Sequence, residues 1–133
     1  MKHLKLIGFI LAVVFSCNAM GQETSKNEDP NTLLFHADSL IAQLKSQDKR
    51  WISFLQAENV LTGIYHIKSG EQDMQKPHDT DEVYYVIDGK AKFIADNKVA
   101  VVSKGSILFV KAEVAHRFTE IEEDLVVLVF FDQ

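Results

Sequence analysis

The sequence contains a single cysteine, Cys17, among its 133 residues. Cys17 lies in a leader segment that we expect to be removed, so the mature domain would have no cysteine. A disulfide bond, a thiolate nucleophile and a cysteine-based zinc site are therefore excluded from that domain. The chain also lacks a Gly-x-Ser-x-Gly elbow, a glycine-rich phosphate loop and a dinucleotide fingerprint, so these three common enzyme classes find no support.

Basic residues are scarce relative to acidic ones. The full chain has 14 Lys and Arg against 19 Asp and Glu, a net charge of −5. Loss of residues 1–21 would remove Lys2 and Lys5 and no acidic residue, which leaves 12 basic and 19 acidic residues and a net charge of −7. No basic stripe is left to neutralise phosphates. We therefore expect no nucleic-acid partner and no electrostatic attraction to anionic membranes.

No hydrophobic run is long enough to span a bilayer comfortably. The apolar run from Leu6 to Phe15 is short, follows a small basic region and precedes small and polar residues. Ala19-Met20-Gly21 fits the small-x-small pattern of a cleavage site. The sequence thus predicts a signal peptide over residues 1–21, cleavage before Gln22, and an exported protein that is periplasmic or secreted.

Cys17 leaves a second processing route open. The residues before it, Val14-Phe15-Ser16, resemble a degraded lipoprotein signal. Cleavage before Cys17 would leave a lipidated cysteine that tethers the domain to a membrane. A membrane is therefore an expected partner only if Cys17 is lipidated; retention of residues 1–21 as an anchor is a further alternative.

Residues 22–48 read as a polar linker followed by an amphipathic helix. Asp29 and Pro30 suit the N-cap and the first helical position. Apolar residues then recur at helical spacing: Leu33, Leu34, Ala37, Leu40, Ile41 and Leu44. We expect a helix within residues 30–47, whose apolar face packs on the core or forms the interface of a homodimer.

Residues 49–133 show a strand pattern instead. Eight short β-branched and aromatic runs occupy residues 51–55, 60–67, 83–87, 91–94, 99–102, 107–110, 114–118 and 125–131. Asp88-Gly89 is a hairpin signal, and Asp96-Asn97 and Lys104-Gly105 predict two further turns. Eight strands without intervening helices predict an all-β sandwich or barrel.

A histidine and a carboxylate, His78 and Glu82, stand four residues apart where a loop runs into a predicted strand. An even spacing on a strand would put both side chains on one face. A second histidine, His116, lies in Ala-Glu-Val-Ala-His-Arg-Phe near the end of the chain. If the fold brings His116 alongside, the set becomes two histidines and one carboxylate, a composition suited to a metal ion.

This region resembles the cupins. Glu82 and Gly89 match the end of the first cupin motif, and the segment from Gly105 to His116 matches the second. The signature of small single-domain cupins reads here Asp73-Met-Gln-Lys-Pro-His-Asp-Thr-Asp-Glu-Val-Tyr-Tyr-Val86. The resemblance covers roughly residues 61–131. It implies a double-stranded β-helix, or jelly-roll, barrel over residues 49–133, with the site inside the barrel.

The chain departs from the usual cupin pattern. Cupins usually carry His-x-His in the first motif, whereas this chain has Lys76-Pro77-His78. The second motif usually has Pro and Gly where Lys111 and Glu113 stand, and Asn where Glu120 stands. The absent histidine removes one metal ligand; the Pro and Gly changes affect a turn.

The resemblance implies a divalent metal ion held by His78, Glu82 and His116. Gln75 would supply a fourth contact through its amide oxygen or hold a metal-bound water. Two histidines and one carboxylate form the facial triad of non-heme iron(II) oxygenases, but iron, manganese, zinc, nickel and copper all remain open. Tyr84 has the same strand parity as Glu82, so it is a candidate catalytic residue that donates to a bound ligand, or else packs in the barrel.

Two classes of function follow. The first is a metal-dependent enzyme, an oxygenase acting on a small organic molecule, with a sugar isomerase or epimerase as a variant. The second is a non-catalytic exported module that binds a metal ion or a small ligand. In both, the expected partner is a small molecule.

Overall fold

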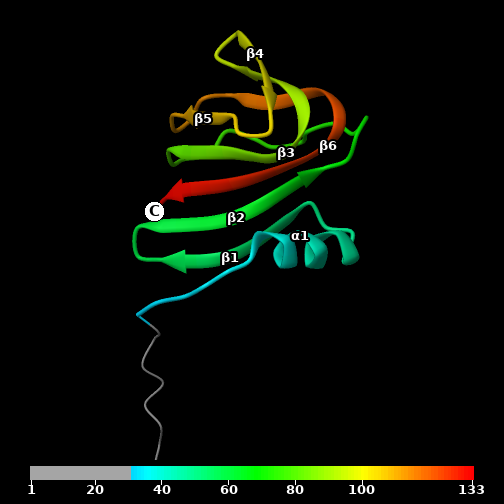
Figure 1. Cartoon of the computed structure of the whole chain (residues 1–133). Coiled ribbons are helices and arrows are strands. Elements are labelled where there is room, and N and C mark those ends of the chain that lie inside the picture. The colour runs from blue at the N-terminus through cyan, green and yellow to red at the C-terminus, as the bar shows by residue number, and fades with distance from the viewer. Residues whose placement is uncertain (1–30) are drawn as a thin grey trace, which may run out of the picture. The chain divides into compact units, whose positions relative to one another are not determined.

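The computed structural model describes residues 31–133, of which residues 34–133 form one compact unit. The unit has one helix and six strands (Figure 1). The elements are α1 (Ala37–Ser46), β1 (Trp51–Ala57), β2 (Val60–Ile67), β3 (Glu82–Ala95), β4 (Lys98–Ser103), β5 (Ile107–Val110) and β6 (His116–Asp132). The predicted signal peptide lies outside the described residues.

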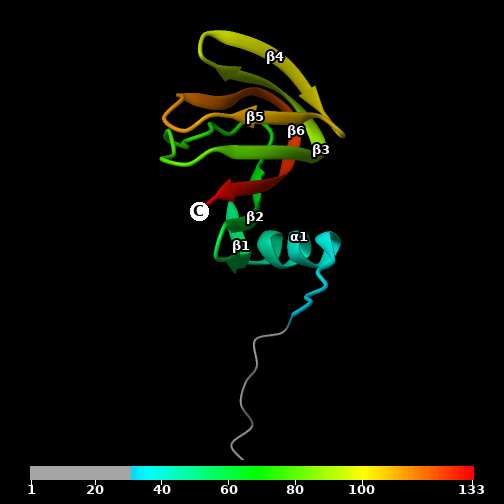
Figure 2. The same ribbon diagram turned by 90° about the vertical axis from the view of Figure 1, so that its left-hand side faces the viewer.

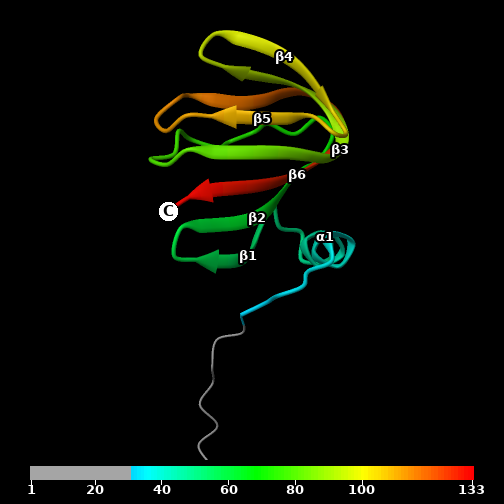
Figure 3. The same ribbon diagram turned by 60° about the vertical axis from the view of Figure 1, so that its left-hand side comes forward.

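The strands form one antiparallel sheet in the order β1-β2-β6-β3-β4, with β5 also paired to β3. The two long strands β3 and β6 organise it. The first part of β3 pairs with β5 and the end of β6, and the second part pairs with β4 and the start of β6. Figures 2 and 3 show β4 curling over at one edge and α1 beside β1 at the other. The all-β jelly-roll expectation is confirmed.

The predicted number of strands was too high, because bulges interrupt the long strands without ending them. Asp88-Gly89 is not a hairpin turn: β3 runs through it, and its register to β6 shifts on both sides of Asp88. Gly89 has φ +95, and Glu120 inside β6 has φ +46. A glycine with positive φ serves a bulge as well as a turn, so the local signal was ambiguous.

The other two predicted turns are confirmed. Asp96 and Asn97 both have positive φ, +47 and +62, and join β3 to β4 as a tight hairpin requires. Gly105, with φ +88, lies in the turn between β4 and β5. These turns place β4 and β5 against different parts of β3.

Helix α1 begins later than the sequence predicted. His36 is its N-cap, so Leu33 and Leu34 lie outside it, while Asp29 and Pro30 lie outside the described residues. The Phe35 ring packs on Phe54 at 4.9 Å between centroids, a tertiary contact that holds the chain before the helix. No helix in the described part of the chain is long and apolar enough to cross a membrane.

The helix ends at Ser46, as expected, and covers one outer face of the sheet. Leu44 is fully buried and packs with Ile64 and Val126. Of the two expected roles for the apolar face of the helix, the structure shows packing on the core. Burial of this face holds a helix of only 10 residues that would be marginal alone.

The main core fills the inside of the sheet. Its buried residues are Ile67, Tyr84, Val86, Ala91, Phe93, Val102, Val110, Phe118, Ile121, Leu125, Val127 and Val129. Along β3, buried and exposed residues alternate from Glu82 to Val86, as a pleated strand requires. This alternation turns Glu82 and Tyr84 into the barrel and Tyr85 outward.

Replacing Glu113 with glycine should stabilise the fold by about 0.5–1 kcal/mol. Glu113 has φ +66, a conformation that costs a non-glycine residue roughly 1–2 kcal/mol, partly offset by the flexibility of unfolded glycine. Urea unfolding should show a higher midpoint at unchanged slope. Lys111→Gly, in the same turn but without positive φ, should lower the midpoint. Equal effects of both variants would contradict this account.

Candidate metal centre

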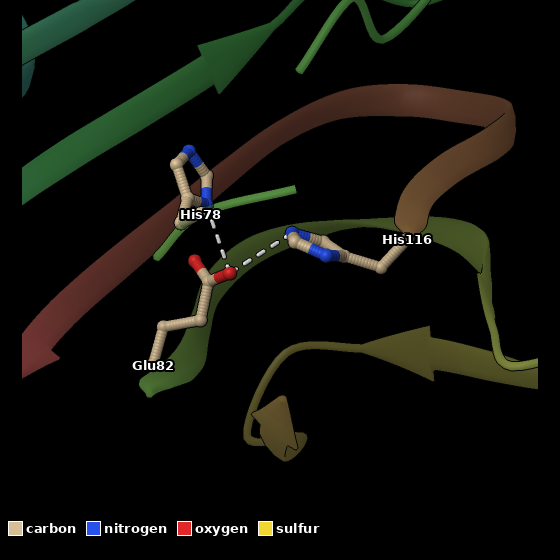
Figure 4. Close-up of side chains that lie close together, drawn as sticks. All are labelled: His78, Glu82 and His116. Carbon is tan, nitrogen blue, oxygen red and sulfur yellow. Dashed lines mark hydrogen bonds and ion pairs between the residues drawn. The ribbon is translucent and has the colours of Figure 1, made fainter. Parts of the chain in front are cut away.

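Three predicted ligand residues converge inside the barrel. One ligand atom from each of His78, Glu82 and His116 lies within 4.8 Å of the other two (Figure 4). Glu82 Oε1 is 2.9 Å from His78 Nδ1 and 3.1 Å from His116 Nε2. Glu82 and His116 are buried, and His78 is partly exposed. The cluster therefore has one accessible edge.

Glu82 and His116 are brought together by the roll of the sheet. Glu82 is the first residue of β3 and His116 the first of β6. The register places His116 beside Ala95, at the far end of β3 from Glu82. The two side chains meet because β3 and β6 curl across the bulges around Gly89 and point both residues into the barrel.

His78 reaches the cluster from the loop between β2 and β3, not from the strand face that its spacing suggested. Two hydrogen bonds from backbone N–H groups of the turn between β5 and β6 fix this loop. The Glu113 N–H donates to the His78 carbonyl at 2.7 Å, and the Ala112 N–H donates to Asp81 Oδ1 at 2.8 Å. The turn between β5 and β6 thus holds His78 in place.

The hydrogen bond at Nδ1 sets the tautomer of His116. Nδ1 lies 2.7 Å from the Val114 carbonyl, which can only accept, so Nδ1 carries a hydrogen. Nε2 then faces Glu82 Oε1 with its lone pair at 3.1 Å. The Nε2 lone pair is thus available to a hydrogen-bond donor, such as the Tyr84 hydroxyl 2.9 Å away, or to a metal ion. A backbone carbonyl that orients the ring in this way is typical of metal-binding histidines.

Tyr84 lies at the centre of the polar network. Its hydroxyl is 2.6 Å from Glu82 Oε2, 3.0 Å from Gln75 Oε1 and 2.9 Å from His116 Nε2. Burial, followed by the hydrogen bond to Glu82, raises the pKa of Tyr84. The phenol therefore stays protonated and offers one hydrogen to these acceptors, which suits a donor better than a base.

Gln75 contacts the cluster through Tyr84. Its Oε1 accepts the Tyr84 hydrogen bond, and its Nε2 donates to Asp73 Oδ2 at 2.7 Å. Direct coordination by Gln75 stays a prediction.

Asp73 caps the loop before His78, as a turn residue would, but the sequence did not indicate its link to the cluster through Gln75. Its carboxylate accepts four hydrogen bonds, from the Tyr65 hydroxyl, the Phe118 N–H, and both the backbone and side-chain N–H of Gln75. The available signal was its place in the signature beside Gln75. Asp73 fixes the loop that carries Gln75 and so sets the position of Gln75 beside Tyr84.

Two cavities border the cluster. One of about 450 Å³ is lined by His78 and Tyr84, and the other of about 710 Å³ is lined by His116. Met74 and Gln75 line both. A small molecule in either cavity would therefore contact residues of the cluster, and both volumes are in the range of ligand sites.

The family model described as the cupin domain matches residues 63–131. The chain belongs to the cupin family. This cupin is also 41% identical over 97 residues to an uncharacterized protein of Streptomyces coelicolor, an alignment that covers 73% of this chain and 92% of that protein. The family expectation is therefore confirmed.

Solved structures support the same fold. KdgF from Halomonas sp. matches this cupin with a TM-score of 0.57 and 16% identity, over 62% of this chain and 76% of that one. DMSP lyase DddQ from Ruegeria pomeroyi DSS-3 matches with a TM-score of 0.57 and 13% identity, over 66% of this chain and 49% of that one. At these identities the likeness concerns the fold alone.

Proposed function

We propose that this cupin binds one divalent metal ion through His78, Glu82 and His116 and acts with it on a small organic molecule. The observation that carries the proposal is the convergence of one ligand atom each from His78, Glu82 and His116 to within 4.8 Å of one another. Two imidazole nitrogens and a carboxylate suit iron, manganese, zinc, nickel or copper. The residues present therefore fit a metal ion.

A bound metal would supply Lewis acidity or, if it is iron, dioxygen activation at positions left open by three protein ligands. The chain's own residues have separate tasks. Tyr84 donates a hydrogen bond to Glu82 Oε2, and the Val114 carbonyl keeps the His116 Nε2 lone pair directed at the centre. The two-histidine, one-carboxylate composition favours an oxygenase among the possible enzymes.

A second candidate is a non-catalytic module for a small ligand. The polar groups of the cluster already have protein partners: Tyr84 contacts Glu82 and His116, and His78 contacts Glu82. These hydrogen bonds give each polar side chain of the cluster a protein partner without a metal ion. The same groups would then hold a small polar end of a ligand.

Elemental analysis of the purified protein, after exposure to each of the five metals, separates these candidates. We expect about one equivalent of one metal, and oxygen uptake with a member of a panel of small acids and diketones. Metal binding without oxygen uptake would reject the oxygenase and retain the metal site. Failure to bind any of the metals would reject the metal proposal in favour of the ligand module.

We further propose export, on the polarity pattern of residues 1–21, which lie outside the described residues. Peptide mass spectrometry of protein from the native host should find Gln22 as the first residue, or a lipidated Cys17. Cys17→Ser should move the protein from membrane to soluble fraction only if Cys17 is lipidated. A cytoplasmic protein that keeps Met1 would show the proposal wrong.

A further inference from the structure

The smaller cavity, of about 450 Å³, has largely apolar walls. Its apolar lining consists of Trp51, Leu61, Met74, Val129 and Phe131. Trp51 and Phe131 pack edge to face at 5.9 Å, and Phe131 packs on the His78 ring at 5.0 Å. An aromatic wall thus runs directly to a residue of the metal centre.

Five of the ten lining residues have polar side chains, and each of these already has a protein partner. His78, Gln75 and Tyr84 belong to the centre or contact it. The Tyr65 hydroxyl donates to Asp73, and Arg50 is held by Glu71 at 2.9 Å and the Gln72 carbonyl. No acidic residue lines this cavity within residues 31–133. A ligand here would find hydrogen-bonding partners at the metal centre and in the remaining N–H groups of Arg50.

We propose that the ligand of this cavity is a small, mostly apolar monoanion, such as an aromatic or branched-chain carboxylate or enolate. The inference rests on the proposed metal site, because a divalent ion beside the Glu82 carboxylate leaves one positive charge to attract one negative ligand oxygen. The hydrocarbon part would pack on Trp51 and Phe131. At roughly 30 Å³ per small group, the cavity holds about 15 non-hydrogen atoms.

The walls also discriminate against sugars. Each hydroxyl buried against an apolar wall without a partner costs about 1–3 kcal/mol. Several hydroxyls on a polyhydroxylated acid would face Leu61, Val129 and Phe131, so a sugar acid of the same charge should bind poorly.

Trp51, the only tryptophan of the chain, provides a direct binding signal. Fluorescence titrations would compare benzoate, its neutral analogue benzamide, and gluconate, a polyhydroxylated monoanion, on zinc-loaded and metal-free protein. We expect zinc-loaded protein to bind benzoate at least about tenfold more tightly than the other two. Metal removal should weaken benzoate binding to the level of benzamide. Trp51→Phe should abolish the signal.

Two variants and one control test the cavity itself. Leu61→Phe fills it, and Met74→Asp puts a negative charge on a wall residue that is 70% exposed and so tolerant of change. We expect Leu61→Phe to weaken benzoate binding about tenfold and Met74→Asp to weaken benzoate but not benzamide. Val101→Phe, at a position that is 66% exposed and outside both the cavity and the metal centre, should have no effect.

The outcomes separate this proposal from the metal site. If zinc binds but gluconate binds as well as benzoate, or neither cavity variant alters benzoate binding, the ligand class is wrong and the metal site stands. If zinc does not bind yet benzoate is preferred over gluconate in a Leu61-dependent way, the metal site fails. The cavity would then still bind mostly apolar ligands, but a metal ion would no longer explain a preference for a negative charge.

A different feature carries a second inference: an exposed apolar patch on β5, β3 and β6. The patch consists of Ile107, Phe109, Val83, Tyr85 and Phe130, with exposed fractions of 70%, 65%, 36%, 39% and 38%. Val83 pairs with both Phe109 and Phe130, and Tyr85 pairs with Ile107. Figure 3 shows the three strands side by side, so the patch is continuous.

We infer that a second copy of this chain covers this patch. Side chains of this size and exposure present on the order of 500 Å² of apolar surface, at the upper end of what monomers expose. A homodimer interface of about 800 Å² per partner, about 65% apolar, needs the same area. All five residues are uncharged and apolar or aromatic. A two-fold axis through the patch would therefore bring apolar side chains of one copy against apolar side chains of the other. The net charge of −5 disfavours an anionic membrane as the occupant.

Light scattering coupled to gel filtration tests the dimer. The wild type should have twice the mass of its chain, and Phe109→Glu should be monomeric. Leu34→Glu, the same kind of change at a residue that is 81% exposed and outside the patch, should stay dimeric. A monomeric wild type at about 100 µM, or a dimeric Phe109→Glu variant, would overturn the inference.

Discussion

The His116→Ala variant should lose most of its bound metal and keep its fold. The substitution removes the Nε2 lone pair and leaves His78 and Glu82 as a two-residue site. Loss of a residue that merely orients a ligand weakens metal binding about 10–100-fold, so loss of a ligand should cost at least 100-fold. The main core does not include His116, so the barrel should remain intact. Elemental analysis and calorimetric metal titration measure the loss.

His66→Ala provides the matched control for this variant. His66 is also a buried strand histidine, but its ring contacts Asp124 rather than the cluster. The His66→Ala variant should have a lower free energy of unfolding and an unchanged metal content. Far-UV circular dichroism establishes that both variants are folded. Full metal occupancy in His116→Ala would end the three-ligand hypothesis.

The Gly89→Ala variant should be severely destabilised. Gly89 has φ +95, and an added Cβ would clash with the carbonyl oxygen of Asp124 and lie 2.8 Å from Leu125 Cα. Both obstacles are backbone atoms of β6, so no side-chain rotation relieves them. Strain and the forced shift of a strand should together cost about 3–5 kcal/mol, a large share of the stability of a small domain. Urea unfolding measures the loss.

Gly70→Ala separates the two causes. Gly70 also has positive φ, +76, but a Cβ there meets no atom within 4 Å. It should therefore lose only the conformational term, about 1 kcal/mol. If Gly89→Ala loses no more stability than Gly70→Ala, the bulge is not the constrained point of β3 that the register indicates.

Local patterns were sufficient for the strands that have one buried face. In β3 the alternation of residue types predicted that Glu82 and Tyr84 share a face, and both are buried while Tyr85 is exposed. Local patterns were insufficient where the same short sequence is compatible with two different backbone structures. Asp88-Gly89 suits a hairpin or a bulge, and only the pairing of β3 with β6 decides between them. The start of α1 likewise depends on the contact between Phe35 and Phe54.

By itself, the sequence determined the cupin family, the inward-facing positions of the strands and the types of donor atom available for a metal ion. Only the tertiary structure decided how these donors meet. Tyr84 and His116 are 32 residues apart, and their contact depends on the curl of two strands. The placement of His78 by the Glu113 N–H and of Gln75 by Asp73 is equally remote from local periodicity. The physical reason is that strand period fixes which face a side chain occupies, whereas long-range packing fixes what lies opposite it.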